Sequence, residues 1–498
     1  MTTFINLLIL VSFLFGILYF YYKQKYNYWK KRKVSFKKPS LIFGNFLDIA
    51  FSKYTVARYF VDLYNNTDGP YFGFYCLSRP YLLIKDVNLI KNILIKDFNS
   101  FSNRIFFVNE KIDPIISNAI NAIKTPHWKY LRKKLSPIFT PKQMKEMSSL
   151  IIECSKNLEK HISNNLSHNL DMKEIAAKYT TDVIASCMFG LDVNSFTKNS
   201  EFQLYGKLLF PNSLLSNLMT STYLYAPFLV QIFKYPLFNK KVVGFFCQVF
   251  KETLNIRKLT KTKRNDLIDM LIEIKDQETN NVFYKFEGNR LFAQPIIFYA
   301  AGHETTSSTI AFTLHELGVN PDIQSKVREE INKKVDKNGE ITYEAIQDMK
   351  YLHMVISETL RKYPTTLLIN RECTENYFIP QTGLVIEKGT PVVISQLALH
   401  YDPKYFPNPQ NFDPERFSDE NKQTIPAGAY LPFGDGPRNC IGERLGLLTV
   451  KFGIVSIVKS FQVVRNPNTK EPIVFECSLF PQLKYGVPLS CIKLEHIF

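Results

Sequence analysis

Phe433-Gly434-Asp435-Gly436-Pro437-Arg438-Asn439-Cys440-Ile441-Gly442 is the most informative run in this chain of 498 residues. Gly434 and Gly436 allow backbone conformations and close approaches that a Cβ atom would obstruct. Cys440 follows them at the start of a helical pattern, where unpaired N–H groups and the positive end of the helix dipole favour a thiolate over a thiol. Thiolate is the form of cysteine that binds a metal. The residues alone leave two interpretations open: a metal-binding loop, or a glycine-rich turn with an incidental buried cysteine.

Two further stretches precede this loop. Glu358-Thr359-Leu360-Arg361 places opposite charges three residues apart, on one face of a helix, and Pro414-Glu415-Arg416-Phe417 follows it. Taken alone, a Glu-x-x-Arg pair is a common feature of solvated helices. The loop itself lacks the preceding strand and the third glycine of a dinucleotide-binding site, which excludes that class.

The loop matches the pattern Phe-x-x-Gly-x-Arg-x-Cys-x-Gly and resembles the haem-binding loop of the cytochrome P-450 family, of the eukaryotic microsomal type. The resemblance covers residues 39–498 and implies a mainly α fold with small β-sheets. It implies that Cys440 is the thiolate ligand of the iron in haem b, with Phe433 and Arg438 also at the haem. Because such a ligand favours O–O cleavage, the implied activity is that of a haem-thiolate monooxygenase.

The other motifs match family positions in the same order. By this resemblance, Glu358, Arg361 and Arg416 form a buried network that supports the haem loop. Charge-assisted arginine contacts suit a partly buried dianion such as the haem propionates. The side chains implied at the propionates are Trp128, Arg132, Arg371 and Arg438.

Ala301-Gly302-His303-Glu304-Thr305-Thr306 resembles the oxygen-activating signature of the family's long central helix. The resemblance implies that Gly302 leaves room beside the haem, and that Thr305 and Glu304 are catalytic through hydrogen bonding and proton delivery. The alternative is that these hydroxyls bond back to preceding helix carbonyls. Pro295 stands in the same predicted helix, and it either kinks that helix or marks a start close by.

The formal charge of +17 is concentrated near the N-terminus. Residues 4–22 carry no charge and span about 28 Å as a helix, close to the hydrocarbon thickness of a bilayer. Residues 23–38 hold eight Lys and Arg and no acid. This asymmetry predicts a single-pass N-terminal membrane helix with residues 23 onward in the cytosol. We expect an anchor at 1–22, a basic juxtamembrane linker at 23–38 with Trp29 at the membrane interface, and a catalytic domain at 39–498.

Local patterns also predict a few elements of the body. Short aromatic and β-branched runs indicate one hairpin that joins 70–76 to 81–85, and another that joins 384–386 to 391–394. The apolar pattern from Leu448 to Val458 indicates a core helix. The eight cysteines show no regular spacing, which excludes a disulfide framework or a zinc cluster.

The chain has no flavin or nicotinamide domain, so we expect electrons from a separate NADPH-cytochrome P-450 reductase at the endoplasmic reticulum. The basic residues predicted near the proximal side could form its docking face; they are Lys129, Lys133, Lys134 and Arg444. Nucleic-acid binding has no supporting motif. Two alternatives are a haem-thiolate isomerase or dehydratase that acts on a peroxide, which Thr305 disfavours, and a non-catalytic haem- or sterol-binding membrane protein.

The resemblance implies a substrate pocket drawn from residues 103–122, 205–238, 296–301, 366–369 and 478–481. Its large apolar side chains fit an apolar small molecule such as a sterol, a fatty acid or a terpenoid, but they could equally lie in the core or face a membrane. In the second stretch these side chains are Phe210, Leu214, Leu215, Tyr223, Tyr225, Phe228 and Phe233.

Overall fold

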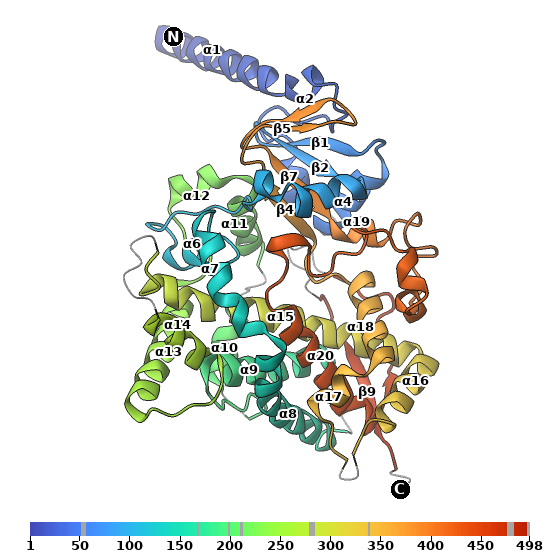
Figure 1. The fold of residues 1–498 in the computed structure, drawn as a ribbon. Coiled ribbons are helices and arrows are strands. Elements are labelled where there is room, and N and C mark those ends of the chain that lie inside the picture. Colours follow the sequence, from blue (N-terminus) through green and yellow to red (C-terminus); the bar gives the residue numbers. More distant parts are fainter. Residues whose placement is uncertain are drawn as a thin grey trace.

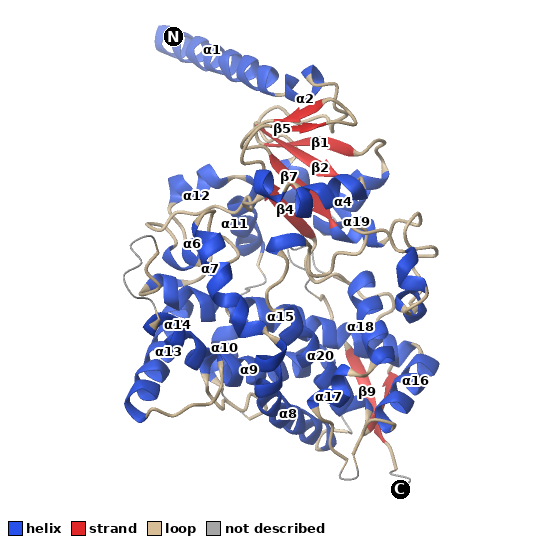
Figure 2. Cartoon of the chain, viewed as in Figure 1, coloured by secondary structure: helices blue, strands red, loops and turns tan. Residues whose placement is uncertain are grey.

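The computed structural model describes residues 1–50, 56–166, 169–197, 200–209, 213–277, 284–336, 339–475 and 483–495. Helices make up most of the body, while strands gather in a layer beside α2 and in a smaller group near the C-terminus (Figures 1 and 2). The expectation of a mainly α fold with small β-sheets is confirmed.

The α-helices range from single turns to α15, which has 31 residues and crosses the middle of the body (Figure 1). Their bounds are α1 (Thr2–Lys25), α2 (Asn27–Lys31), α3 (Phe46–Ala50), α4 (Val56–Asn65), α5 (Val87–Lys91), α6 (Pro114–Asn118), α7 (His127–Leu135), α8 (Pro141–Ser163), α9 (Met172–Phe189), α10 (Glu201–Lys207), α11 (Leu214–Tyr225), α12 (Pro227–Phe233), α13 (Lys240–Thr260), α14 (Leu267–Asp276), α15 (Asn289–Val319), α16 (Pro321–Asn332), α17 (Tyr343–Gln347), α18 (Lys350–Lys362), α19 (Gln396–His400) and α20 (Glu443–Val458).

The strands form three sheets whose order differs from the order of the chain. The four-stranded sheet runs β1 (Tyr71–Cys76), β2 (Arg79–Ile84), β7 (Pro391–Ser395) and β4 (Leu368–Glu372). The three-stranded sheet runs β3 (Leu170–Asp171), β9 (Pro488–Lys493) and β8 (Phe461–Arg465), and the pair is β5 (Tyr377–Ile379) with β6 (Leu384–Ile386).

One of the two predicted hairpins is confirmed, and the other is wrong. β1 and β2 pair antiparallel. By contrast, β6 pairs with β5, whereas β7 lies between β2, to which it is parallel, and β4. Every residue of β7 is buried. A strand that is paired on both edges has no edge left for β6, so proximity along the chain does not lead to pairing here.

The N-terminal helix α1 projects from the body (Figure 1). It belongs to a run, Thr3–Lys31, that is long and apolar enough to cross a membrane by length and composition, and none of its apolar window is buried. The expectation that Trp29 lies at a membrane interface is wrong, because its side chain is 0% exposed. Its indole N–H donates to the Phe74 carbonyl at 3.3 Å, and the ring lies where a Cβ on Gly73 would come within 2.6 Å of it. Part of the basic segment therefore packs on β1, while the boundary at residue 38 stays a prediction.

The α15 helix runs through Pro295 without a break. It begins at Asn289, only six residues earlier, so Pro295 lies near the helix start. This is the second of the two alternatives, a helix that starts close to the proline. The neighbouring Gln294 amide donates to the Arg290 carbonyl at 2.8 Å and to the Asn118 carbonyl at 2.9 Å. These bonds fix this end of α15 against the C-terminal end of α6.

Two apolar cores meet at the segment before α20. Leu431 is buried in the core around the four-stranded sheet, whereas Phe433 and Ile441 pack against the core around α15, α9 and α8. The predicted core helix is confirmed, since α20 is buried from Leu448 to Val458. The loop that carries Cys440 is thus held from both sides.

Candidate functional site

A cavity of about 520 Å³ is lined by residues from both cores. The structure brings all of the residues predicted for the site to this one cavity. They are Trp128, Arg132, Gly302, Glu304, Thr305, Arg371, Phe433, Arg438 and Cys440.

The loop before α20 is closed by its own backbone. The Cys440 amide donates to the Phe433 carbonyl at 2.8 Å, and Asp435 accepts from the Gly436 amide at 2.7 Å at the start of a short 3-10 turn, Gly436–Arg438. Gly436 has φ +71°, and it packs against the carbonyl of Leu94. This closure sets the position of Cys440 before α20 begins.

Cys440 is exposed where it lines the cavity, and the surrounding chain encloses it elsewhere. Burial by the surrounding chain raises the pKa of its thiol, while a hydrogen bond from the Gly442 backbone acts in the opposite direction. Glu443 adds to the rise, and the charges of Arg104 and Arg132 oppose it. The protein supplies part of the stabilisation that a thiolate needs, and a bound metal ion would supply the rest.

Glu358 is the centre of a buried ion-pair network. Arg361 donates to its two carboxylate oxygens at 2.7 and 2.8 Å, and both side chains are fully buried. Arg416 lies 3.4 Å from the same carboxylate, and the Asp413 amide donates to it at 2.9 Å. The expected network of Glu358, Arg361 and Arg416 is confirmed.

His400, which the sequence did not single out, joins this network to the haem-loop segment. Arg361 donates to the His400 carbonyl at 2.9 Å, and the ring Nδ1 lies 3.2 Å from the Arg361 carbonyl. The Leu431 amide donates to Nε2 at 3.0 Å. Burial, followed by the charge of Arg361, lowers the pKa of His400 to about 3. The ring is therefore neutral, and it donates through Nδ1 and accepts through Nε2.

Four arginines line the cavity together: Arg104, Arg132, Arg371 and Arg438. Burial, followed by the charges of neighbouring arginines, lowers the pKa of Arg371 to about 9 and that of Arg438 to about 8. The Arg438 guanidinium also lies 4.2 Å from the centre of the Trp128 ring. Arg104 fell within the stretch 103–122 expected at the substrate pocket, but it stands in no motif and was not predicted to join the other three arginines.

These arginines have unused hydrogen-bond donors. Among the described residues, Nε of Arg371 and both Nε and Nη1 of Arg438 are buried without a partner. A buried donor without a partner is costly, so such a group of like charges indicates an anionic ligand. Within the described ranges, no three His, Cys, Asp or Glu side chains gather as a metal site. A metal at Cys440 must bring its other ligands with it, and the residues present fit a haem with two propionates.

The α15 wall of the cavity includes Ala301, Gly302 and Thr305. The Thr305 hydroxyl donates to the Ala301 carbonyl at 2.7 Å, as the alternative interpretation expected. Its oxygen can still accept a hydrogen bond from the cavity. A Cβ on Gly302 would lie 3.2 Å from Ile184 of α9, so the lack of a side chain here also lets α9 pack closely against α15.

Glu304 has a partner that the sequence did not indicate. Lys173, in the first turn of α9, lies 2.9 Å from Glu304 Oε1. The lysine also donates to the Ser307 hydroxyl at 2.7 Å. Because α9 and α15 are distant in the sequence, nothing in the motif around Glu304 could have revealed this pair.

Four of the five stretches expected at the substrate pocket contribute to the cavity wall, and residues 478–481 lie outside the described residues. Of the apolar side chains expected from 205–238, Tyr225 lines the cavity. Tyr223 is buried with Phe107 and Val230 in a separate cluster. Leu215, Phe228 and Phe233 are exposed, which fits the alternative of a surface that faces a membrane. Phe210 and the Leu214 side chain lie outside the described part.

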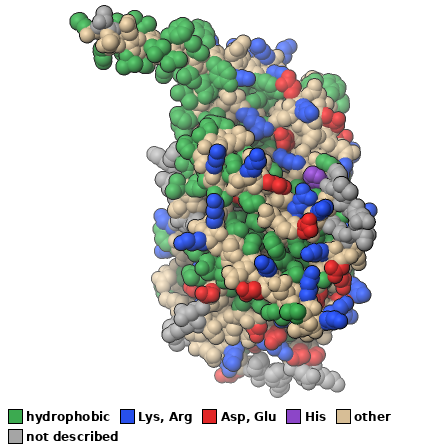
Figure 3. Space-filling model, turned by 90° about the vertical axis from the view of Figure 1, so that its left-hand side faces the viewer, with side chains coloured by type: hydrophobic (Ala, Val, Ile, Leu, Met, Phe, Trp, Pro, Cys, Tyr) green, Lys and Arg blue, Asp and Glu red, His purple; other side chains and the backbone are tan. Residues whose placement is uncertain are grey.

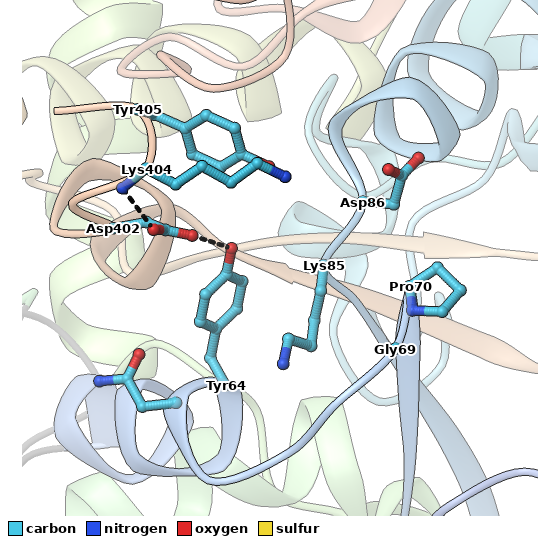
Figure 4. Close-up of a pocket in the computed structure, with 9 residues that line it drawn as sticks. Tyr64, Gly69, Pro70, Lys85, Asp86, Asp402, Lys404 and Tyr405 are labelled. Carbon is cyan, nitrogen blue, oxygen red and sulfur yellow. Dashed lines mark hydrogen bonds between the residues drawn. The ribbon is translucent and has the colours of Figure 1, made fainter.

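A second cleft, of about 430 Å³, lies elsewhere, beside α4 and the segment after α19 (Figure 4). The Tyr64 hydroxyl donates to Asp402 at 2.8 Å, and Lys85 donates to the Thr67 carbonyl. These polar groups already have partners within the protein. The cleft shares no lining residue with the cavity at Cys440.

A cysteine that faces a cavity, together with buried arginines whose donors are only partly paired in the described structure, defines a site for a haem held by a thiolate. The comparisons agree. Residues 34–489 match the family model described as Cytochrome P450, and the chain belongs to the cytochrome P450 family.

Its relatives include Cytochrome P450 6k1 of Blattella germanica, which is 39% identical and aligns over 98% of this chain and 97% of the relative. Cytochrome P450 6j1 of the same organism is 37% identical over 96% of each chain. Probable cytochrome P450 6g2 of Drosophila melanogaster is 36% identical over 98% of each chain. Members of this family are haem-dependent monooxygenases, and the haem carries a cysteine thiolate ligand.

Proposed function

We propose that this chain inserts one oxygen atom from O2 into an apolar small molecule, with haem b held by Cys440 and with electrons from a separate NADPH-cytochrome P-450 reductase. The observation that carries the proposal is the single cavity in which Cys440, the buried arginines and the α15 signature meet. The bound haem would supply the activation of O2.

The residues of the chain would then have distinct tasks. Cys440 would hold the iron, and Arg132, Arg371 and Arg438 would bind the propionates. Trp128 would also reach a propionate, and Phe433 would pack against the porphyrin. These contacts would orient the group and would satisfy the guanidinium donors that have no partner in the described part of the chain.

On the α15 side, Thr305 and Glu304 would handle protons. The Thr305 oxygen can accept a hydrogen bond from a water molecule in the cavity, and Glu304 can take up and release a proton at its carboxylate. Gly302 would allow a close approach of this helix to the reacting atoms. These roles depend on both side chains lining the cavity, as they do.

The reductase would dock on the basic surface formed by α7 and the start of α20. Lys129 and Lys133 are exposed on α7, and Arg444 is exposed at the start of α20. Arg132, on the same helix as the two lysines, donates to the Asn439 carbonyl at 3.0 Å. The surface thus lies directly behind the Cys440 loop, where an electron donor could approach the haem.

The membrane would be that of the endoplasmic reticulum, with α1 crossing it once and the body in the cytosol. Helix α12 lies on the side of the body toward which α1 projects (Figure 1), and its Phe228 and Phe233 side chains are exposed. Hydrophobic side chains also appear below α1 on the face drawn in Figure 3. Such a surface suits contact with lipid.

The substrate would be apolar because most of the lining of the cavity is apolar. Phe106, Ile120, Leu224, Ile297 and Leu367 all line the cavity. A pocket of this composition binds mainly through burial of apolar surface.

The test uses the full-length chain in membranes with reductase, NADPH and O2. We expect the ferrous carbon monoxide complex to show the red-shifted Soret band of thiolate ligation, and a lipid panel to yield at least one oxygenated product. Cys440→Ala should abolish the band, whereas Cys247→Ala, in α13 outside the cavity, should keep it. Product formed from a hydroperoxide without NADPH or reductase would instead identify a haem-thiolate isomerase or dehydratase. A missing band would overturn both the monooxygenase and this alternative.

A further inference from the structure

Lys173 is fixed in place by the start of α9. Its backbone N–H donates to the Asp171 carboxylate at 3.0 Å, and the same carboxylate oxygen accepts from the Val487 amide at 2.9 Å. The first turn of α9 is thereby attached to the segment that leads into β9. A lysine whose Cα is held in this way loses less freedom when its ammonium is bound.

The ammonium group of Lys173 connects two side chains of α15. It lies 2.9 Å from Glu304 Oε1 and 2.7 Å from the Ser307 hydroxyl, and the Ser308 hydroxyl donates to the same Oε1 at 3.3 Å. Both contacts of the carboxylate go to Oε1. Within the described ranges Oε2 has no protein partner, and Glu304 is one of the residues that line the cavity.

The other charged or titratable groups nearby do not substitute for Lys173. His303 is adjacent to Glu304, but burial lowers its pKa to about 4, so the ring is neutral. Lys207 of α10 lies 4.0 Å from Glu174, which also pairs with Lys178 at 3.5 Å. Among the described residues, Lys173 is therefore the cation that forms an ion pair with Glu304.

We infer that Lys173 is a positioning residue for Glu304, an inference that rests on the function proposed above. By binding Oε1, it leaves Oε2 available to exchange a proton at the cavity that Glu304 lines. The side chains of Lys173 and Glu304 are 17% and 23% exposed, so the pair lies between the protein surface and the cavity. Without the ammonium, the carboxylate loses its orientation, and its proton reaches the cavity less often.

The experiment compares Lys173→Met with the wild type, using the full chain with reductase and a substrate that the wild type oxygenates. We expect product per NADPH consumed to fall about 10- to 100-fold. The two electrons of each unproductive NADPH should appear with O2 and two protons as hydrogen peroxide. Haem content and the substrate-binding spectrum should stay unchanged, because neither depends on Glu304 orientation.

The matched control is Lys178→Met, on the same helix, which removes a lysine paired with Glu174 rather than with Glu304. It should behave as the wild type, and Lys173→Arg should restore most of the coupling. A readout independent of turnover is the infrared C–O stretch of the ferrous carbon monoxide complex. It should shift in Lys173→Met and not in Lys178→Met, because only the first changes the charge beside Glu304.

A double variant completes the test. If Lys173 acts through Glu304, then Lys173→Met adds little to the loss caused by Glu304→Gln. Equal coupling in Lys173→Met and the wild type would overturn the inference, as would a loss of substrate affinity and haem in parallel. A wild type that forms no product, or lacks the thiolate band, would instead refute the proposed function itself.

Discussion

Replacing Gly436 with alanine should weaken the Cys440 loop far more than the same change at Gly434. The two glycines have nearly the same backbone conformation, with φ +72° at Gly434 and +71° at Gly436. An alanine in this left-handed region costs about 1–2 kcal/mol at either position. The conformational part of the penalty therefore cancels between the two variants.

The difference between them is steric. At Gly436 a Cβ would lie 1.9 Å from the carbonyl oxygen of Leu94 and 2.8 Å from its carbonyl carbon. At Gly434 the nearest atom would be 3.9 Å away. Leu94 lies in a π-helical turn, Asn92–Lys96, and its side chain is buried, so this backbone cannot move aside cheaply. Forced overpacking adds about 1–3 kcal/mol.

The assay is the rate at which the thiolate-type carbon monoxide band disappears at one fixed elevated temperature. Strain that is released on unfolding accelerates this loss. We expect Gly434→Ala to lose the band about 5- to 30-fold faster than the wild type. Gly436→Ala should be faster than Gly434→Ala by a further factor of about 5 to 140, from about 1–3 kcal/mol at a factor of ten per 1.4 kcal/mol. Equal rates for the two variants would refute the steric argument.

Three other changes probe the fold. Trp29→Ala empties a fully buried site on β1 and should destabilise the protein by about 3–5 kcal/mol, measured by thermal unfolding; a change as small as that of an exposed side chain would contradict the packing described. Glu358→Gln removes the charge that faces Arg361 and should cost about 3–5 kcal/mol, visible as faster loss of haem, whereas unchanged retention would argue against the network. Burial raises the pKa of Asp182 to about 6 from its ordinary 3.8, so the folded state holds the extra proton and stability falls as pH rises through this window. Asp182→Asn keeps an acceptor for the Ser195 amide and should raise stability at pH 7–8 by up to about 3 kcal/mol; a pH profile of the melting temperature identical to that of the wild type would contradict this.

Local sequence predicted the elements whose cause is local. The spacing of Glu358 and Arg361 needs only a helix, and α18 supplies it. The apolar pattern around Leu448 needs only a core, and α20 is buried there. The hairpin β1–β2 forms across a short turn. In each case neighbours in the chain interact directly, so their residue types are sufficient.

Local sequence failed where a distant segment decides the outcome. β7 was expected to pair with β6, but it lies between β2 and β4. Trp29 was expected at a membrane interface because it follows an apolar helix, but the space over Gly73 buries it. An aromatic side chain suits both environments, and the choice depends on whether a cavity of the right shape lies within reach.

The chain by itself therefore determined the class of protein and the identity of its central cysteine, because the loop around Cys440 combines several residue types at fixed short spacings. It also determined that an apolar N-terminal helix precedes the body. Only the tertiary structure decided which other side chains serve the cavity. Arg104, His400 and Lys173 stand in no motif, yet they lie within hydrogen-bonding or ionic range of the site or of its supports. Electrostatic and steric interactions act over a few ångströms of space, and such distances between remote segments are set by how the two cores pack.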